Sequence, residues 1–313
     1  MRRTVGPITK PNRSARKQPP APVPAPRGSW WRIAAILLAG VLTYANSLSG
    51  PFILDDQSTI ADNQQIREWW RPSIVLAPEP NTAIAGRPVV NVTFAANYAT
   101  GGLDVRGYHV VNISLHLLCG LLAFGIIRWT LDLPRLRKRF GGRTADVACA
   151  AALLWVVHPV NSEVVNYLTE RTESLMALFY LLTLYASIRG WPALAVMSCA
   201  LGMASKESMV TAPLVVVLYD RVFVYDSFGQ ALRARRGFYA ALASTWVVLG
   251  ALMASGPRSA VGGFSTGVSP WTYLLNQAVT IAHYLRLSFW PRSLVVFYGW
   301  PVPLTLWDVL PYA

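Results

Sequence analysis

The stretch YHVVNISLHLLCGLLAFGIIRWTL, residues 108–131, decides the fold class of this chain. A helix that crosses the hydrocarbon core of a bilayer needs about 20 mostly apolar residues, and Arg128 is the one charged residue in this stretch. Comparable runs lie on both sides of it, so we predict an all-α polytopic membrane protein with about eight or nine transmembrane helices. The runs expected to cross lie near 32–49, 108–131, 145–158, 174–188, 191–204, 209–225, 238–256 and 271–290, and 294–313 begins another.

The composition of the 313-residue chain supports a membrane protein. It is 53% hydrophobic and 14% charged, with a mean hydropathy of +0.36, whereas soluble domains are about a quarter charged. An ordinary soluble enzyme and a disordered scaffold are therefore excluded. The net charge of +13 could suggest nucleic acid, but the basic residues alternate with apolar runs and no nucleic-acid-binding motif is visible. We expect no nucleic-acid partner.

The N-terminal segment differs from the rest. Residues 1–29 are basic, rich in proline and free of acidic residues, so we predict a disordered tail over 1–31. The apolar run that follows is interpreted as an uncleaved first membrane helix rather than a secretory signal, and 32–313 as one transmembrane domain. The cysteines stand inside apolar runs without metal-ligand spacing, and we expect neither a disulfide framework nor a metal site. They are Cys119, Cys149 and Cys199.

Basic residues predict the orientation of the spans, because loops on the cytoplasmic side carry an excess of Lys and Arg. With the N-terminus in the cytoplasm and the spans threaded alternately, 21 of the 28 basic residues fall on the inner side. Ten of the fifteen acidic residues then fall on the outer side. Ionisable groups close to a membrane are costly and usually functional, so the outer side is the expected location of a site.

The first outer loop, residues 49–107, is the longest connection and is expected to carry short interfacial helices. Asp55 and Asp56 follow the first span directly and could form a general base with an orienting partner, a metal site, or an ordinary helix cap. Arg87 precedes Pro88; such an arginine could clamp a phosphate, although Arg-Pro is also a helix-start signal.

Polar side chains also interrupt the spans themselves. His109, Asn112 and His116 share one helical face, which predicts either hydrogen bonds between helices or a cavity lining. Residues 158–173 form the densest polar passage between two spans, and the spacing of Glu163 and Glu170 predicts a short helix along the outer surface. Lys206-Glu207 stands between two further apolar runs, where a lysine is a natural phosphate contact.

These motifs together resemble a known family. The runs that carry the resemblance, in chain order, are Phe52–Asp56, Gly86–Pro88 with Asn97-Tyr98, Gly107–His116, His158-Pro159 with Glu163, Arg171 with Glu173, and Ser205–Glu207. Over about residues 40–225 the chain resembles the membrane half of the transmembrane and tetratricopeptide-repeat O-mannosyltransferases and their bacterial relatives, which are GT-C glycosyltransferases. Family members continue with further spans and helical repeats, so we expect the chain to be incomplete at its C-terminus.

The resemblance implies a GT-C-like bundle with a catalytic first outer loop. It also implies a polyprenyl-phosphate sugar as donor, such as dolichyl-phosphate mannose, and a hydroxyl acceptor, expected to be a protein. Asp55 is our candidate for the base and Asp56 for its orienting neighbour, while Arg87 and Lys206 would contact the phosphate. Further donor-binding candidates are Arg171, His109 and His158, with Arg258 behind them. Supporting residues are Glu163, Glu173, Glu207, Asn112 and His116. No cofactor is expected besides the lipid-linked donor, and a divalent metal at the acid pair is the lesser alternative.

Two other classes of protein remain open. A transporter would carry charges at the bilayer midplane and paired discontinuous helices, whereas the ionisable groups here gather at one border. A membrane scaffold that has lost catalysis is the second alternative. Alanine-rich spans and the Pro/Arg tail favour a bacterial plasma membrane, with the endoplasmic reticulum as the location in a eukaryote.

Overall fold

The computed structural model describes residues 30–255, 269–296, 298 and 306–309. Residues 1–29 of the predicted tail and Arg258 lie outside the described residues, whereas Trp30 and Trp31, which the prediction also assigned to the tail, form the start of α1. Every regular element within these ranges is helical, which confirms the all-α prediction. The longer helices are α1 (Trp30–Tyr44), α4 (Val105–Leu131), α6 (Thr144–Val156), α8 (Arg171–Arg189), α9 (Pro192–Met203), α10 (Ala212–Tyr219), α11 (Phe228–Ser244), α12 (Trp246–Ala254) and α13 (Pro270–Phe289).

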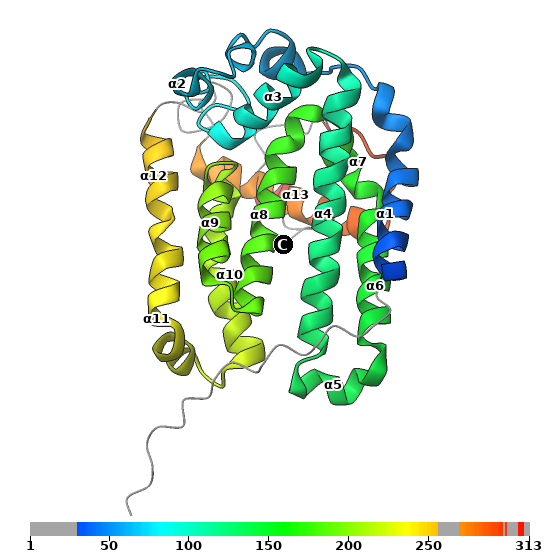
Figure 1. The fold of residues 1–313 in the computed structure, drawn as a ribbon, viewed down its shortest axis with the longest axis vertical. Helices are drawn as coiled ribbons and strands as arrows, with labels where there is room; N and C mark the ends of the chain where they lie inside the picture. Colours follow the sequence, from blue (N-terminus) through cyan, green and yellow to red (C-terminus); the bar gives the residue numbers. More distant parts are fainter. Residues whose placement is uncertain (1–29, 256–268, 297, 299–305, 310–313) are drawn as a thin grey trace, which may run out of the picture.

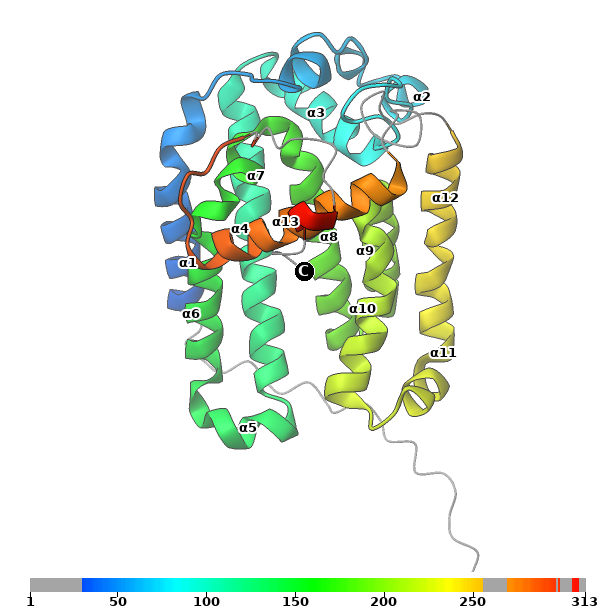
Figure 2. The same ribbon diagram turned by 180° about the vertical axis from the view of Figure 1, so that it is seen from behind.

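Most of these helices run side by side and form a bundle with two distinct ends (Figure 1). At one end, which we call the loop end, residues 50–104 fold over the bundle and include α2 (Pro72–Val75) and α3 (Pro88–Gly101). At the other, the α5 end, α5 (Pro134–Phe140) connects α4 to α6. Helix α13 runs obliquely across one side of the bundle (Figure 2).

Several helices have the length and composition of membrane spans. Among the described residues three meet both criteria, Trp30–Ser49, Val105–Leu131 and Phe228–Ala254. The bent pair Pro134–Val156 and Pro159–Asn166, which meets at 49°, would make a fourth. Helices α8 and α13 reach the length without the apolar composition. A membrane protein is thus confirmed at this coarser level, and the count of eight or nine spans stays a prediction.

Small residues allow the helices of the bundle to approach closely. A Cβ atom on Gly40 of α1 would lie 2.3 Å from a methyl carbon of Leu117 on α4, and one on Gly120 would lie 2.3 Å from a methyl carbon of Val156 on α6. Such contacts are typical of membrane helices, where packing replaces the hydrophobic effect as the driving force. They place α4 centrally against α1 and α6, so that its polar face meets other helices.

The loop end has a hydrophobic core of its own. Ile60, Ile66 and Phe94 are fully buried and pack with Tyr108 of α4 and Leu168. Pro88 occupies the first turn of α3 and Arg87 precedes it, so the Arg-Pro pair does start a helix, where the missing proline N–H is no loss. This core joins the loop to α4 and to the segment before α8, and it thereby sets the position of the acid pair.

Candidate active site

The two adjacent carboxylates of the loop have different environments. Asp56 is fully buried: one carboxylate oxygen accepts hydrogen bonds from the backbone N–H (2.7 Å) and the hydroxyl (2.6 Å) of Thr169, and the other accepts from the backbone N–H of Ile53 (3.1 Å). Asp55 is exposed. The residue before it, Leu54, has a φ of 46°, a strained conformation of the kind that clusters at functional sites. The geometry therefore leaves Asp55 accessible and makes Asp56 an anchor.

A short segment before α8 holds the Asp55 turn in place. The backbone N–H of Asp55 donates to the Tyr167 hydroxyl (3.1 Å), and the hydroxyls of Thr59 and Thr169 are 2.8 Å apart. Burial raises the pKa of Tyr167, and the Asp55 carboxylate raises it further, so the phenol keeps its proton next to that carboxylate. Sequence reasoning missed Tyr167 and Thr169, because no spacing rule links them to residues more than 100 positions earlier.

Two ion pairs lie at the same end of the bundle. Lys206 Nζ is 2.6 Å from a carboxylate oxygen of Glu173, and Arg87 Nη2 is 3.1 Å from one of Glu207. All four side chains retain some exposure, 18% for Arg87 and 34% for Glu207. Arg87 also donates to the carbonyl of Ala83 (2.6 Å), while its Nε is buried without a hydrogen-bond partner. The two cations predicted to contact a phosphate are therefore held in place with donor capacity left over.

Additional carboxyl groups surround these ion pairs. Burial raises the pKa of Glu170 most strongly, and Lys206 opposes this shift. Glu163 stands in the short helix α7 (Ser162–Asn166) and is half-buried. Tyr284 of α13 lies within electrostatic range of both carboxyl groups. The loop end thus contains more carboxylates than cations around Lys206, a surrounding that favours proton acceptance.

Replacing Glu170 with glutamine is expected to raise the melting temperature at pH 7. Because burial raises the pKa of this carboxyl, the folded protein binds its proton more readily than the unfolded chain does. Stability from this group is therefore lost as pH rises through the raised pKa. Glutamine removes the charge, so the gain should shrink as the pH falls towards the carboxyl range. The melting temperatures of the wild type and the variant are compared at pH 7 and at an acidic pH in the carboxyl range, with the exposed Glu79→Gln as control. A variant that is less stable than the wild type at pH 7 would contradict the raised pKa of Glu170.

A buried arginine occupies the interior below the loop. Arg171 is 0% exposed. Its Nε donates to the side-chain oxygen of Asn112 (2.7 Å), and its terminal nitrogens donate to that of Asn97 (2.6 Å) and to the carbonyl of Tyr108 (3.0 Å). The guanidinium also lies over the ring of Phe94, 4.5 Å from its centre. The predicted contact between Arg171 and a donor phosphate would require this cluster to open.

The predicted histidines make interior contacts. His109 and His116 are buried, and each has its Nε2 near a backbone carbonyl, that of Gly50 (3.0 Å) and that of Val156 (2.9 Å). Asn112 of the same face bonds to Arg171, so of the two alternatives for this stripe the structure shows hydrogen bonding between elements. His158 accepts a hydrogen bond from the backbone N–H of Val160 (3.3 Å) and caps a short helix.

The structure thus divides the predicted residues into two groups. One group lies at the loop end, where Asp55 contacts Tyr167, Lys206 pairs with Glu173, and Arg87 pairs with Glu207. Its members are Asp55, Arg87, Glu163, Glu173, Lys206 and Glu207. The other group forms interior or capping contacts; its members are Asp56, His109, Asn112, His116, His158 and Arg171. Within the described ranges no group of three or more His, Cys, Asp or Glu side chains has metal-site geometry.

Comparison with known proteins finds relatives in the family that the sequence motifs resemble. A protein O-mannosyl-transferase of Caenorhabditis elegans, F38B6.6, is 29% identical over 197 residues, which are 58% of this chain and 27% of that protein. Tmtc2 of Xenopus laevis is 30% identical over 217 residues, 59% of this chain and 23% of its own length. Tmtc2 of Drosophila melanogaster is 27% identical over an alignment 312 residues long. This alignment covers 87% of this chain and 31% of the Drosophila protein.

The chain is a distant homologue of these O-mannosyl-transferases. The similarity concerns their N-terminal membrane part, and it confirms the resemblance inferred from the motifs. The aligned stretches amount to about a quarter of the length of these relatives, and tetratricopeptide repeats are not in the matched region. No protein-family model matches the chain, and no solved structure is significantly similar to it.

Proposed function

We propose that this chain is the membrane part of a glycosyltransferase that moves a hexose, mannose or a similar sugar, from a polyprenyl-phosphate donor to a hydroxyl group of an acceptor, a protein serine or threonine. Homology to enzymes named protein O-mannosyl-transferases supports the reaction class. The observation that carries the proposal is that Asp55, whose carboxylate is accessible, and Lys206 both contact one short segment, residues 167–173, while Arg87 pairs with Glu207, the neighbour of Lys206.

The donor phosphate is assigned to Lys206 and Arg87. The Lys206 ammonium has three N–H donors, of which the Glu173 carboxylate accepts one, and Arg87 has an unpartnered Nε. The carboxylates that pair with these cations orient them and lower the cost of keeping two positive charges close to a membrane. A phosphate arriving from the bilayer can then accept hydrogen bonds from the remaining Lys206 N–H groups, whereas Arg87 Nε is buried and becomes available only when the Arg87 side chain shifts.

Sugar transfer needs one proton to be removed and one bond to be broken. The acceptor hydroxyl attacks the anomeric carbon while the Asp55 carboxylate takes the hydroxyl proton. The bond between the anomeric carbon and the phosphate oxygen breaks, and the lipid phosphate leaves with the electron pair. Lys206 and Arg87 stabilise the negative charge that grows on this oxygen. A single displacement of this kind predicts inversion at the anomeric carbon. The distribution of basic residues predicts that the loop end faces away from the cytoplasm.

A direct assay with purified protein tests the proposal. The protein is incubated with radiolabelled polyprenyl-phosphate mannose, glucose or galactose and with a peptide rich in serine and threonine. Label is expected in the peptide from one of these donors. Consumption of none of them would end the glycosyltransferase proposal, whereas label accumulating inside sealed vesicles without a peptide product would favour a transporter. The variant Asp104→Asn, at an exposed helix cap on the same loop, serves as the active control.

Replacing Lys206 with methionine is expected to lower kcat/KM for sugar transfer about 10²-fold, because one stabilising donor at the departing phosphate is lost. Lys206→Arg keeps a cation at the same position and should retain more activity. Arg71→Met provides the matched control, since Arg71 is a cation of residues 50–104 whose ion pair with Glu68 is exposed. Initial rates at several donor concentrations give the measurement. Unchanged kinetics in Lys206→Met would remove this residue from the phosphate site.

A further inference from the structure

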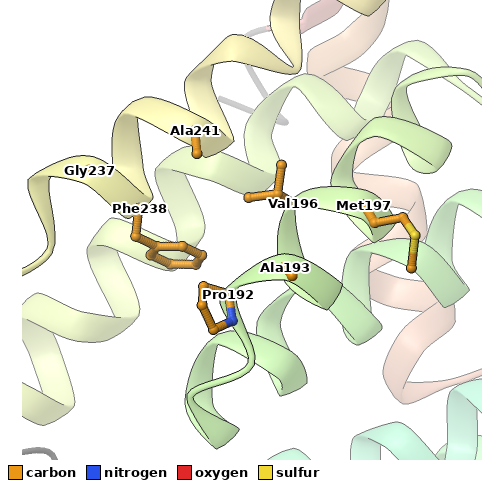
Figure 3. A pocket seen from close by; sticks show the side chains of 7 residues that line it. All are labelled: Pro192, Ala193, Val196, Met197, Gly237, Phe238 and Ala241. Atoms are coloured by element: carbon orange, nitrogen blue, oxygen red, sulfur yellow. The ribbon is translucent and has the colours of Figure 1, made fainter.

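An apolar groove lies between α9 and α11, on the outside of the bundle (Figure 3). Its volume is about 660 Å³, and no lining side chain carries a charge or a hydrogen-bonding group. Several lining residues are small, so that the two helices leave a channel between them. The lining residues are Pro192, Ala193, Val196 and Met197 of α9, and Gly237, Phe238 and Ala241 of α11.

A partly buried ion-pair cluster lies against one wall of this groove. The Arg235 guanidinium lies 4.3 Å from the centre of the Phe238 ring. Arg235 in turn is 2.6 Å from a carboxylate oxygen of Asp220 and donates to the carbonyl of Ser187 (3.2 Å). The hydroxyl of Tyr239 donates to the same oxygen of Asp220. Because Phe238 packs against a fixed guanidinium, the groove is a formed feature of the fold and not a gap that a rotating side chain would close.

Two basic residues of α11 precede the groove-lining residues in sequence, on either side of a kink at Arg235. Arg233 and Arg236 precede Gly237 in sequence, and both are exposed. Neither makes an ion pair with any described residue. On α9, the exposed Trp191 precedes Pro192, and tryptophan prefers the border between lipid tails and headgroups. An apolar groove whose two helices carry exposed arginines and a border tryptophan next to the lining residues matches a ligand with an anionic head and an apolar tail.

We propose that this groove binds one acyl chain of an anionic phospholipid, whose phosphate is contacted by Arg233 and Arg236. The site is separate from sugar transfer, because α11 begins near the α5 end of the bundle, whereas α3, which follows Arg87, belongs to the loop end (Figure 1). Charge complementarity selects the headgroup: a zwitterionic lipid offers the same tail with no net charge, and each basic residue near a surface favours an anionic lipid by several fold.

Lipid titration of the delipidated protein, followed by native mass spectrometry, tests the site. Phosphatidylglycerol is compared with phosphatidylcholine that has the same acyl chains. The wild type is expected to bind one phosphatidylglycerol more tightly than any phosphatidylcholine. The double variant Arg233→Gln/Arg236→Gln should lose about tenfold or more of the affinity for that lipid. The matched control Arg137→Gln/Lys138→Gln removes two exposed charges from α5 and should keep the tight site.

A second variant tests the groove without touching any charge. A Cβ atom on Gly237 would meet no atom within 4 Å, so the backbone accepts a side chain here, and Gly237→Leu places apolar atoms at a position that lines the groove; its melting temperature is measured alongside. We expect it to weaken both lipids. The proposal is overturned if Gly237→Leu binds phosphatidylglycerol as the wild type does, or if the α5 control loses as much affinity as the groove variant. Equal loss would mean a general attraction to the charged end, and preferential binding of polyprenyl phosphate would assign the groove to the donor.

Discussion

Replacing Asp55 with asparagine is expected to reduce sugar transfer by about 10²–10⁴-fold, the usual contribution of a general base. Asparagine keeps the size of the side chain and removes its ability to accept a proton. The folded structure should remain, because the turn is held through the backbone N–H of Asp55 and through Asp56, and neither contact uses the Asp55 carboxylate. Transfer rates at saturating donor, measured next to the melting temperature of the same preparation, give both quantities.

The neighbouring substitution provides the matched control. Asp56→Asn places an NH₂ group or a weaker acceptor against the backbone N–H and hydroxyl of Thr169, and buried donors left without an acceptor cost about 1–3 kcal/mol each. We expect this variant to melt at a lower temperature while each folded molecule keeps most of its activity. The reverse pattern, a stable but inactive Asp56→Asn and an active Asp55→Asn, would exchange the two roles.

The acid pair shows how far sequence reasoning reaches. Two adjacent carboxylates directly after a span indicate a site at the membrane border, and the structure places them at the loop end. Which of the two is accessible could not be predicted, because the answer depends on Thr169 and Tyr167, which meet the pair only through the folding of the loop onto α8. Hydrogen-bond partners at long sequence separation leave no periodic signal.

The membrane spans likewise could be predicted only where they depend on the local sequence. Hydropathy identified the runs that became α4 and the joined helices α11 and α12, because a long apolar run needs no partner to be recognised. The span expected at 271–290 corresponds to α13, which runs obliquely across the bundle (Figure 2) and is not among the helices with the length and apolar composition of a span, so this span stays a prediction. Asn276, Gln277, His283 and Arg286 give α13 a polar character, which hydropathy averaged over the run does not reveal.

For the polar side chains of α4, the sequence predicts that they share one face of the helix, but it does not predict their hydrogen-bond partners. The spacing of His109, Asn112 and His116 places them on one side of a helix, and all three are buried. Their partners come from three other parts of the chain: Gly50, Arg171 and Val156. Arg171 was predicted at the site because of its place among polar residues on the outer side. Its burial follows from Asn97 and Asn112, which offer it neutral oxygens.

Replacing Arg171 with methionine is expected to destabilise the protein by about 3 kcal/mol or more, since the oxygens of Asn112, Asn97 and Tyr108 each lose a donor in a buried setting and each costs about 1–3 kcal/mol. Methionine has a similar length and retains the packing against Phe94, so the loss reports on hydrogen bonds. Arg171→Lys keeps the charge without the planar fork and should also be destabilised. Chemical unfolding in detergent, followed by tryptophan fluorescence, measures the change.

The control Arg106→Met removes an exposed arginine from the same end of the bundle and should leave stability within about 0.5 kcal/mol of the wild type. The pair of readouts also separates the two roles considered for Arg171. An arginine that binds the donor phosphate would, when replaced, leave the unfolding transition in place and raise KM for the donor. An arginine that joins α3, α4 and α8 would lower the unfolding midpoint and leave KM of the surviving folded molecules unchanged, which is the outcome that its complete burial leads us to expect.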